Sequence, residues 1–265
     1  MIPLLYLFFP LAPTLAAETP VSRFRYSQNE NESLVLQVGR YSARTDLLVD
    51  DSLEHSIIFD GETNPAAIYM FDGQEAIRLT APALNRVAAH LNIRYEEMRR
   101  QLDEAFGEMS DELKQELVSD LPNVDPINLD SQPEVTFHST EKIAWQNRTA
   151  KAGELLVDGE KRGSAVLLEK APVTLEEQQQ KTLVNFQQLL NSWIEIVRRQ
   201  PEFTGGENPY EETQNLILDY FPRLAHFSES VEIKLVDWEQ QSTGQRPFEL
   251  PEGVPVQPVD RGLFD

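Results

Sequence analysis

The stretch Ser56–Leu91, SIIFDGETNPAAIYMFDGQEAIRLTAPALNRVAAHL, determines the fold expected of this chain. Three short apolar segments in it are separated by Asp60-Gly61 and Asp72-Gly73. Asp-Gly is a strong hairpin signal, because glycine accepts a positive φ without steric cost. The third segment leads directly into Pro82, which suits the first turn of a helix. We therefore predict three antiparallel strands followed by a helix laid against them. The strands are expected at 57–59, 67–71 and 76–79.

The same two patterns recur along the rest of the chain. Apolar and polar residues alternate at 33–46, 134–145 and 155–169, which is typical of half-buried antiparallel strands. In 230–239 the apolar set changes sides, as at a β-bulge. A further strand at the edge of the sheet is expected within 18–32. Two helical segments are predicted at about 82–118 and 174–227, and the second opens with the capping-box pattern Thr174-Leu-Glu-Glu177. The fold class is thus α+β.

Residues 1–17, MIPLLYLFFPLAPTLAA, carry no charged side chain and are almost wholly apolar. The apolar core is shorter than the roughly 20 residues that span a bilayer, and Ala16 and Ala17 suit cleavage before Glu18. We predict a signal peptide, with an uncleaved interfacial anchor as the alternative. The chain has no cysteine, so disulfides and a lipidated cysteine are excluded. The mature protein is therefore expected to be periplasmic, exported and soluble, with no integral membrane segment after cleavage.

The charge of the chain narrows the partners that are expected. It has 265 residues, 40% of them hydrophobic, with 44 acidic and 23 basic residues and a formal net charge of −21. Such a field repels phosphate backbones and anionic headgroups, so we expect no nucleic acid partner and no electrostatic docking on a membrane. Basic partners remain allowed.

No residue pattern in the chain indicates a reaction. The four histidines, His55, His90, His138 and His226, fall in different predicted elements without a partner at ligand spacing. Zinc-protease, calcium-loop, nucleophile-elbow and phosphate-loop motifs are absent from the sequence. We therefore predict no catalytic residue, no metal site and no cofactor, and we expect a protein that is not an enzyme.

Two segments carry a resemblance to a known family. The strands "IIFDGETNPAAIYMFDGQEAIRLT" and the ending "PFELPEGV" at 247–254 are similar to uncharacterised secreted bacterial relatives of the lipoprotein-carrier fold. That fold is the incomplete β-barrel of periplasmic lipoprotein chaperones. The resemblance covers roughly 33–254 and implies an antiparallel, strongly curved sheet covered on its concave side by helices. It implies a single half-barrel domain over 18–254, followed by an extended tail at 255–265.

The ending makes a prediction of its own. Phe248 and Leu250 are two residues apart, so an extended chain points both side chains to one side. We expect this segment to dock as a final strand or clasp, and deletion after Gln257 to be nearly silent.

Two functions from different classes are compatible with these patterns. The first is a non-catalytic binding or carrier protein for a hydrophobic ligand, an acyl chain or lipid, because one predicted strand is apolar on both faces and the helices have broad apolar stripes. The same residues would be ordinary core if there is no ligand. The alternative is an envelope module for protein–protein interaction or sensing, in which an exposed sheet edge accepts a partner strand. The candidate lining residues of the carrier are Ile58, Tyr69, Phe71, Trp145, Phe186 and Trp193.

Overall fold

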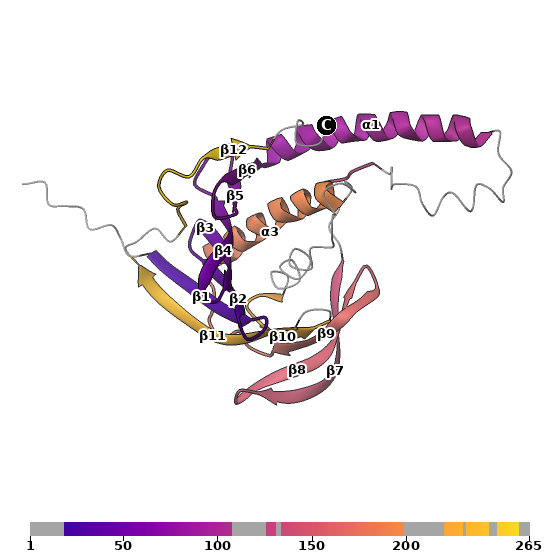
Figure 1. Ribbon diagram of the computed structural model, residues 1–265. Helices are drawn as coiled ribbons and strands as arrows, with labels where there is room; N and C mark the ends of the chain where they lie inside the picture. The colour runs from indigo at the N-terminus through magenta and orange to yellow at the C-terminus, as the bar shows by residue number, and fades with distance from the viewer. Residues whose placement is uncertain are drawn as a thin grey trace, which may run out of the picture.

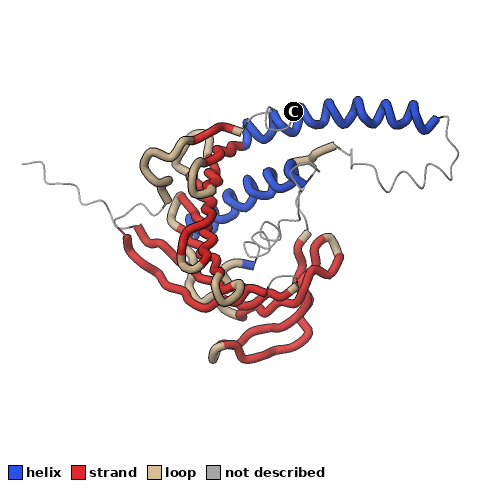
Figure 2. Tube along the Cα trace, in the orientation of Figure 1, coloured by secondary structure: helices blue, strands red, loops and turns tan. Residues whose placement is uncertain are grey.

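The computed structural model describes residues 19–107, 126–130, 134–198, 220–229, 232–243 and 248–259. In these residues twelve strands form one sheet in the order β12-β6-β5-β4-β3-β2-β1-β11-β10-β9-β8-β7. All neighbouring strands are antiparallel except β12 and β6, which are parallel. Two helices, α1 and α3, accompany the sheet in the described part of the chain (Figures 1 and 2). The α+β class is confirmed, and the sheet is open because β12 and β7 lie at its opposite ends.

The bounds of the elements follow the chain. The strands are β1 (Thr19–Ser27), β2 (Glu32–Val38), β3 (Ser42–Val49), β4 (Ser52–Asp60), β5 (Ala67–Phe71), β6 (Ala76–Thr80), β7 (Val135–Trp145), β8 (Arg148–Val157), β9 (Glu160–Leu168), β10 (Leu224–Ser228), β11 (Glu232–Thr243) and β12 (Val256–Pro258). The helices are α1 (Ala81–Gly107) and α3 (Glu177–Arg198). The predicted signal segment and the predicted helical residues 108–118 and 199–219 lie outside the described residues.

The stretch Ser56–Leu91 folds as predicted, into β4, β5, β6 and the start of α1. Gly73 has a φ of +93° in the turn between β5 and β6, where Asp72 Oδ1 accepts hydrogen bonds from the N–H groups of Gln74 and Glu75. Gly61 serves a different purpose from the expected tight turn, because a Cβ there would lie 2.6 Å from the Tyr41 carbonyl oxygen. The Thr80 hydroxyl accepts from the Ala83 N–H at the first turn of α1.

Strand β1 lies in the middle of the sheet, between β2 and β11. The prediction of an edge strand here was wrong. Its Phe24 and Tyr26 side chains are fully buried, and the strand joins the amino-terminal strands to strands from the carboxyl-terminal third of the chain. The register between β1 and β11 shifts at Arg25/Tyr26, which leaves Val236 unpaired and confirms the predicted β-bulge.

The prediction of helix through residue 227 was also wrong at its end. Leu224–Ser228 forms strand β10, which pairs with β9 on one side and β11 on the other. Pro222 lies two residues earlier, and proline interrupts a helix because it lacks an N–H and clashes with the preceding turn. Helix α3 begins at Glu177, and Gln179 Oε1, instead of the expected Thr174, accepts the Glu176 N–H at 3.0 Å.

The carboxyl-terminal segment docks on the sheet at two places. The Phe248 ring lies against Gly39, where an added Cβ would come within 2.7 Å of Phe248 Cε2. The chain becomes a strand only at Val256–Pro258, inside the expected tail, and pairs there with β6. Val259 is buried and its N–H donates to the Arg78 carbonyl at 3.1 Å. The tail is therefore part of the fold as far as Val259.

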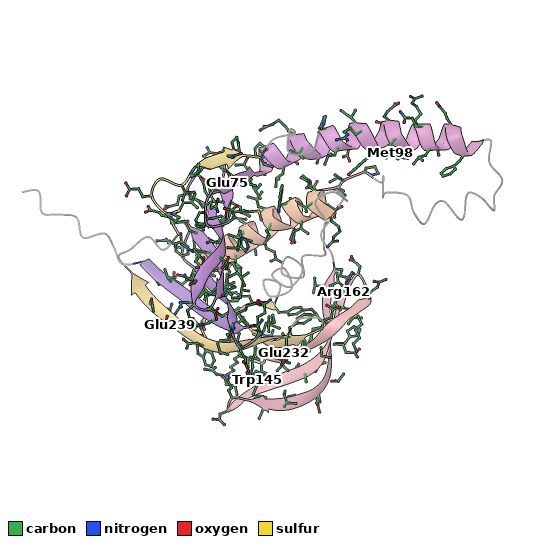
Figure 3. All side chains as sticks on the ribbon, in the orientation of Figure 1. Glu75, Met98, Trp145, Arg162, Glu232 and Glu239 are labelled. Carbon is green, nitrogen blue, oxygen red and sulfur yellow. The ribbon has the colours of Figure 1, made fainter. Side chains whose placement is uncertain are left out.

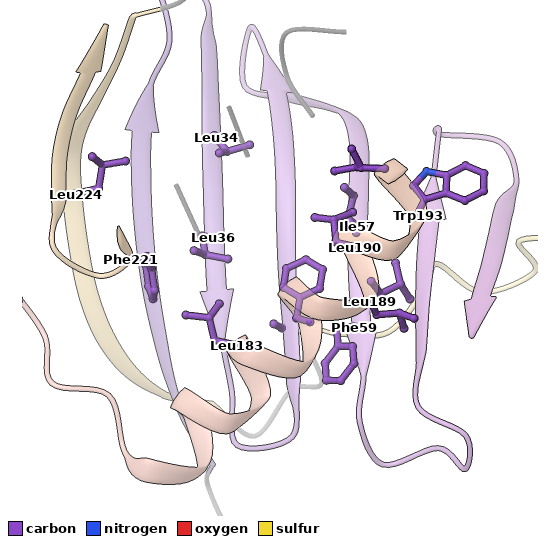
Figure 4. Close-up of a cluster of buried hydrophobic side chains, with 14 of the residues drawn as sticks. Leu34, Leu36, Ile57, Phe59, Leu183, Leu189, Leu190, Trp193, Phe221 and Leu224 are labelled. Atoms are coloured by element: carbon purple, nitrogen blue, oxygen red, sulfur yellow. The ribbon is translucent and has the colours of Figure 1, made fainter. Parts of the chain in front are cut away.

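The hydrophobic core lies between the sheet and α3 (Figure 4). Alternation along β4 directs Ile57 and Phe59 to the side of α3, and the Phe59 and Phe186 ring centroids are 6.0 Å apart. Pairing extends this face across neighbouring strands, because Phe59 stands opposite Ala43 and Ile68. Helix α1 packs against α3 and β6, and its later turns extend beyond the sheet in Figure 1.

Candidate functional site

Helix α3 is fixed to the sheet by two buried polar side chains. Gln179 is fully buried, and its Nε2 donates to the Val38 carbonyl at 2.8 Å. Thr182 Oγ1 donates to the Arg40 carbonyl at 2.7 Å. Both bonds use backbone acceptors at the carboxyl end of β2 and in the turn that follows it, and they fix the start of α3 to the sheet.

After Gln179 and Thr182, the apolar side chains of α3 pack in the core between the helix and the sheet. Leu183, Phe186, Leu190 and Trp193 follow one another at helical spacing and are all buried. The strands that α3 contacts most are β2, β3, β5 and β6, at the end of the sheet away from β7.

The apolar surface continues on the same side of the sheet over β7 and β8. Val135 pairs with Val157 and Phe137 pairs with Leu155, and Leu155 belongs to the hydrophobic core. The Phe137 ring centroid lies 6.3 Å from that of Tyr220, whose hydroxyl donates to the Val135 carbonyl at 3.3 Å.

Val135, Phe137, Val157 and Tyr220 are only half-buried, although they pack on the core. We take these four residues as the candidate site and call them the β7–β8 apolar surface. Exposed apolar area next to a closed core is a usual feature of sites for apolar ligands.

The structure separates the six residues predicted to line a ligand cavity. Phe186 and Trp193 lie on α3 and are buried in the core, where the Phe186 ring contacts that of Phe59. Ile58, Tyr69 and Phe71 alternate with Ile57, Ile68 and Met70 of the core, so they lie on the opposite face of the sheet. Trp145 lies at the end of β7, stacked on His226 with ring centroids 5.6 Å apart. The six residues therefore do not form one cavity wall.

The side chains of the β7–β8 apolar surface gave a signal in the sequence. Val135 and Phe137, and Leu155 and Val157, alternate with polar residues there. The pattern indicates a strand with one apolar face. It could not show that the helix covering the rest of that face packs at the other end of the sheet.

A second cluster surrounds Trp145 and includes Glu232, both labelled in Figure 3. Lys234 Nζ lies 5.5 Å from the Trp145 ring centroid, and His226 Nε2 lies 2.8 Å from Glu232 Oε1. Gln146 Nε2 is 3.5 Å from the Leu235 carbonyl oxygen. These contacts hold the β7–β8 turn against β10 and β11.

Two hollows lie on the described surface. One of about 250 Å³ is bounded by β7, β8, β9 and β10 beside His226 and Glu154. The other, of about 770 Å³, runs along the projecting part of α1 and is lined mainly by charged side chains between Ile93 and Glu104. The first is smaller than a usual ligand pocket, and the second has the wrong polarity for an acyl chain.

Burial and a neighbouring cation shift the pKa values of two groups in the described residues. Burial raises the pKa of Tyr26 well above its ordinary value. The hydrogen bond from Lys161, at 2.6 Å, lowers the pKa of Glu154. In the described ranges, no three His, Asp or Glu side chains come together as a metal site would require.

Comparison with known proteins gives weak structural similarity. No family model matches the chain, and no curated protein matches it. It is similar to a solved structure described as an uncharacterized conserved protein from Thermus thermophilus, with 8% identity, 91% of each chain covered and a TM-score of 0.38. Among the described helices, none combines the length and apolar composition needed to cross a membrane.

Proposed function

We propose that this protein is a non-catalytic carrier for a hydrophobic ligand, an acyl chain or lipid, that binds on the helix-bearing side of the sheet. The observation that supports the proposal most is the β7–β8 apolar surface. Its four side chains are continuous with the core, but they are half-buried and not closed over. An acyl chain laid along them would remove apolar area from water at about 25 cal/mol per Å².

The proposal takes the sheet as a strongly curved half-barrel with α3 on its concave side, as in the lipoprotein-carrier fold. The open sheet supports this, because a half-barrel is not closed and the end strands β12 and β7 do not pair with each other. It also takes residues 1–17 as an export signal and the periplasm as the place of action. Fractionation of cells producing the full chain tests this location.

Binding is tested by titrating the protein with a fluorescent fatty acid and repeating the titration with Phe137→Ala. Loss of the Phe137 ring should weaken binding about tenfold, since burial of part of a ring contributes about 1.4 kcal/mol. Ile93→Ala is the matched control, because Ile93 is 68% exposed on α1. The proposal is wrong if the wild-type protein binds no acyl ligand, or if both variants bind as tightly as it does.

The second candidate function is an envelope interaction module, and one observation favours it. Strand β7 has 11 residues and forms one of the two edges of the sheet in the described part of the chain, and His138 to Lys142 are exposed. A partner strand could pair there. Hydrogen exchange separates the two functions, because a carrier gains amide protection when fatty acid is added and an interaction module does not.

A further inference from the structure

Arg162 occupies an irregular position in the ladder of strand β9. The register with β8 passes from Leu156↔Lys161 to Leu155↔Gly163, so Arg162 is the extra residue of a β-bulge. Strand β10 ends opposite Ser164 and does not reach Arg162. A bulge redirects a side chain out of the regular alternation, and bulges are frequent beside functional sites.

The bulge borders the β7–β8 apolar surface. Val157, a member of that surface, pairs with Glu160 two residues before Arg162. On the other side, Gly163 stands opposite buried Leu155, and a Cβ at Gly163 would lie 2.8 Å from the Phe227 ring. Figure 3 shows Arg162 at this end of β9. The Arg162 backbone therefore lies between the strand positions that pair with Val157 and Leu155.

Arg162 lacks a partner although acids are abundant. Its side chain is half-buried, and within the described residues it makes no ion pair and no hydrogen bond. The neighbouring Lys161 is paired with Glu154 at 2.6 Å, and Asp158 Oδ1 accepts the Glu134 N–H at 2.8 Å. A half-buried arginine without a counter-charge is a candidate partner for an anion, since ion pairs to arginine strengthen where water is partly excluded.

We propose that Arg162 binds the anionic headgroup of an amphiphile whose acyl chain lies on the β7–β8 apolar surface. The ligand class is then an acyl chain ending in a carboxylate or a phosphate, since the planar guanidinium can donate two parallel hydrogen bonds to either group. This inference rests on the proposed carrier function and adds the chemistry of the ligand head.

The test compares three ligands of equal chain length on three proteins. Dodecanoate, dodecyl phosphate and uncharged dodecanol are titrated by calorimetry into the wild-type protein, Arg162→Gln and Arg86→Gln. Arg86 is the matched control, because it is an exposed arginine of α1. Circular dichroism and the urea midpoint establish that each variant is folded.

We expect Arg162→Gln to weaken binding of both anions about tenfold and to leave dodecanol unchanged, while Arg86→Gln changes nothing. The preferred anion identifies the headgroup as carboxylate or phosphate. High salt should weaken the binding of the two anions and leave the binding of dodecanol unchanged. Equal loss for all three ligands, or no loss for the anions, overturns the role of Arg162 and leaves the carrier function standing. If no ligand binds the wild-type protein, the carrier function itself fails.

Discussion

Tyr26 places a hydroxyl in the centre of the core. The side chain is fully buried on β1, and its hydroxyl lies 3.3 Å from the Leu224 carbonyl oxygen, to which it donates. This bond joins the first strand to β10, 198 residues later. A buried phenolate would be poorly solvated, and burial accordingly raises the pKa of Tyr26.

The raised pKa predicts a loss of stability in alkali. Above pH of about 10 the unfolded chain releases the Tyr26 proton while the folded protein keeps it. Stability therefore falls as pH rises through that value. Tyr26→Phe should lower the free energy of unfolding by about 1 kcal/mol at pH 7, because the hydrogen bond is lost. It should also make stability fall less steeply between roughly pH 9 and pH 11, the window set by the reference pKa of tyrosine. Urea unfolding at several pH values measures both effects, and an unchanged slope would contradict the assignment.

Gln179 provides a second prediction at the scale of one residue. Its amide donates to the Val38 carbonyl and accepts the Glu176 N–H in the core. Gln179→Ala should destabilise the fold by about 2 kcal/mol, because both backbone groups lose their partner. Gln188→Ala is the control, since this glutamine of α3 is exposed and the change in helix propensity is the same. Similar urea midpoints for the two variants would show that the buried amide contributes little.

Among the elements, the hairpins depend on residues that accept a positive φ. Asp50 and Asp51 have φ values of 51° and 59°, and Asp158 and Gly159 have 52° and 83°. Two consecutive positive φ values are typical of the type I′ turn, which matches the twist of the flanking strands. Gln146 and Asn147 form a third such turn, with 45° and 63°, although no glycine marks it in the sequence.

The carboxyl-terminal strand gives a prediction that corrects the expectation from the sequence. Val256 is 44% exposed, whereas Val259 is 2% exposed. Val259→Ala should destabilise the protein by about 2 kcal/mol, the loss expected for two buried methyl groups, and Val256→Ala should have little effect. Thermal or urea unfolding measures the difference. Deletion after Gln257 should then be destabilising and not silent, because Pro258 pairs with Arg78 and Val259 packs in the core.

At the scale of the whole molecule, one sheet unites distant parts of the chain. Strand β1 pairs with β11 over nine positions, from Thr19↔Thr243 to Ser27↔Lys234. The core cluster contains residues of β1 to β6, both helices and β8 to β11. The two sets of hairpins thus share one apolar interior and are expected to form one cooperative unit.

Cooperativity can be tested with Phe24→Ala. The Phe24 ring packs edge-on against Phe221 at 4.4 Å, so its loss should destabilise the fold by about 3 kcal/mol or more. Far-ultraviolet circular dichroism and tryptophan fluorescence should still report a single, coincident transition. Trp145 and Trp238 report on the second half of the sheet. An early fluorescence transition in this variant, with most of the dichroism retained, would show that the halves unfold separately.

Local patterns predicted much of this fold because they act over a few residues. The strands at 57–59, 67–71 and 76–79 and the helix after Thr80 follow from alternation, Asp72-Gly73 and Pro82. The α+β class and the bulge at Val236 could likewise be predicted from the sequence. The candidate cavity residues were not, since alternation shows that a strand has two faces and leaves open which face meets a helix.

The sequence by itself determined most of the strands, turns and helices of the described residues, although not strands β10 and β12, because backbone preferences and hydrophobic period are properties of neighbouring residues. Only the tertiary structure decided that β1 is central, that Ile58, Tyr69 and Phe71 face away from α3, and that Arg162 falls at a bulge beside half-buried Val157. These outcomes depend on strand pairing between residues far apart in the sequence, such as Thr19 and Thr243. The free energy of such pairing comes from packing that forms only when the whole sheet is assembled.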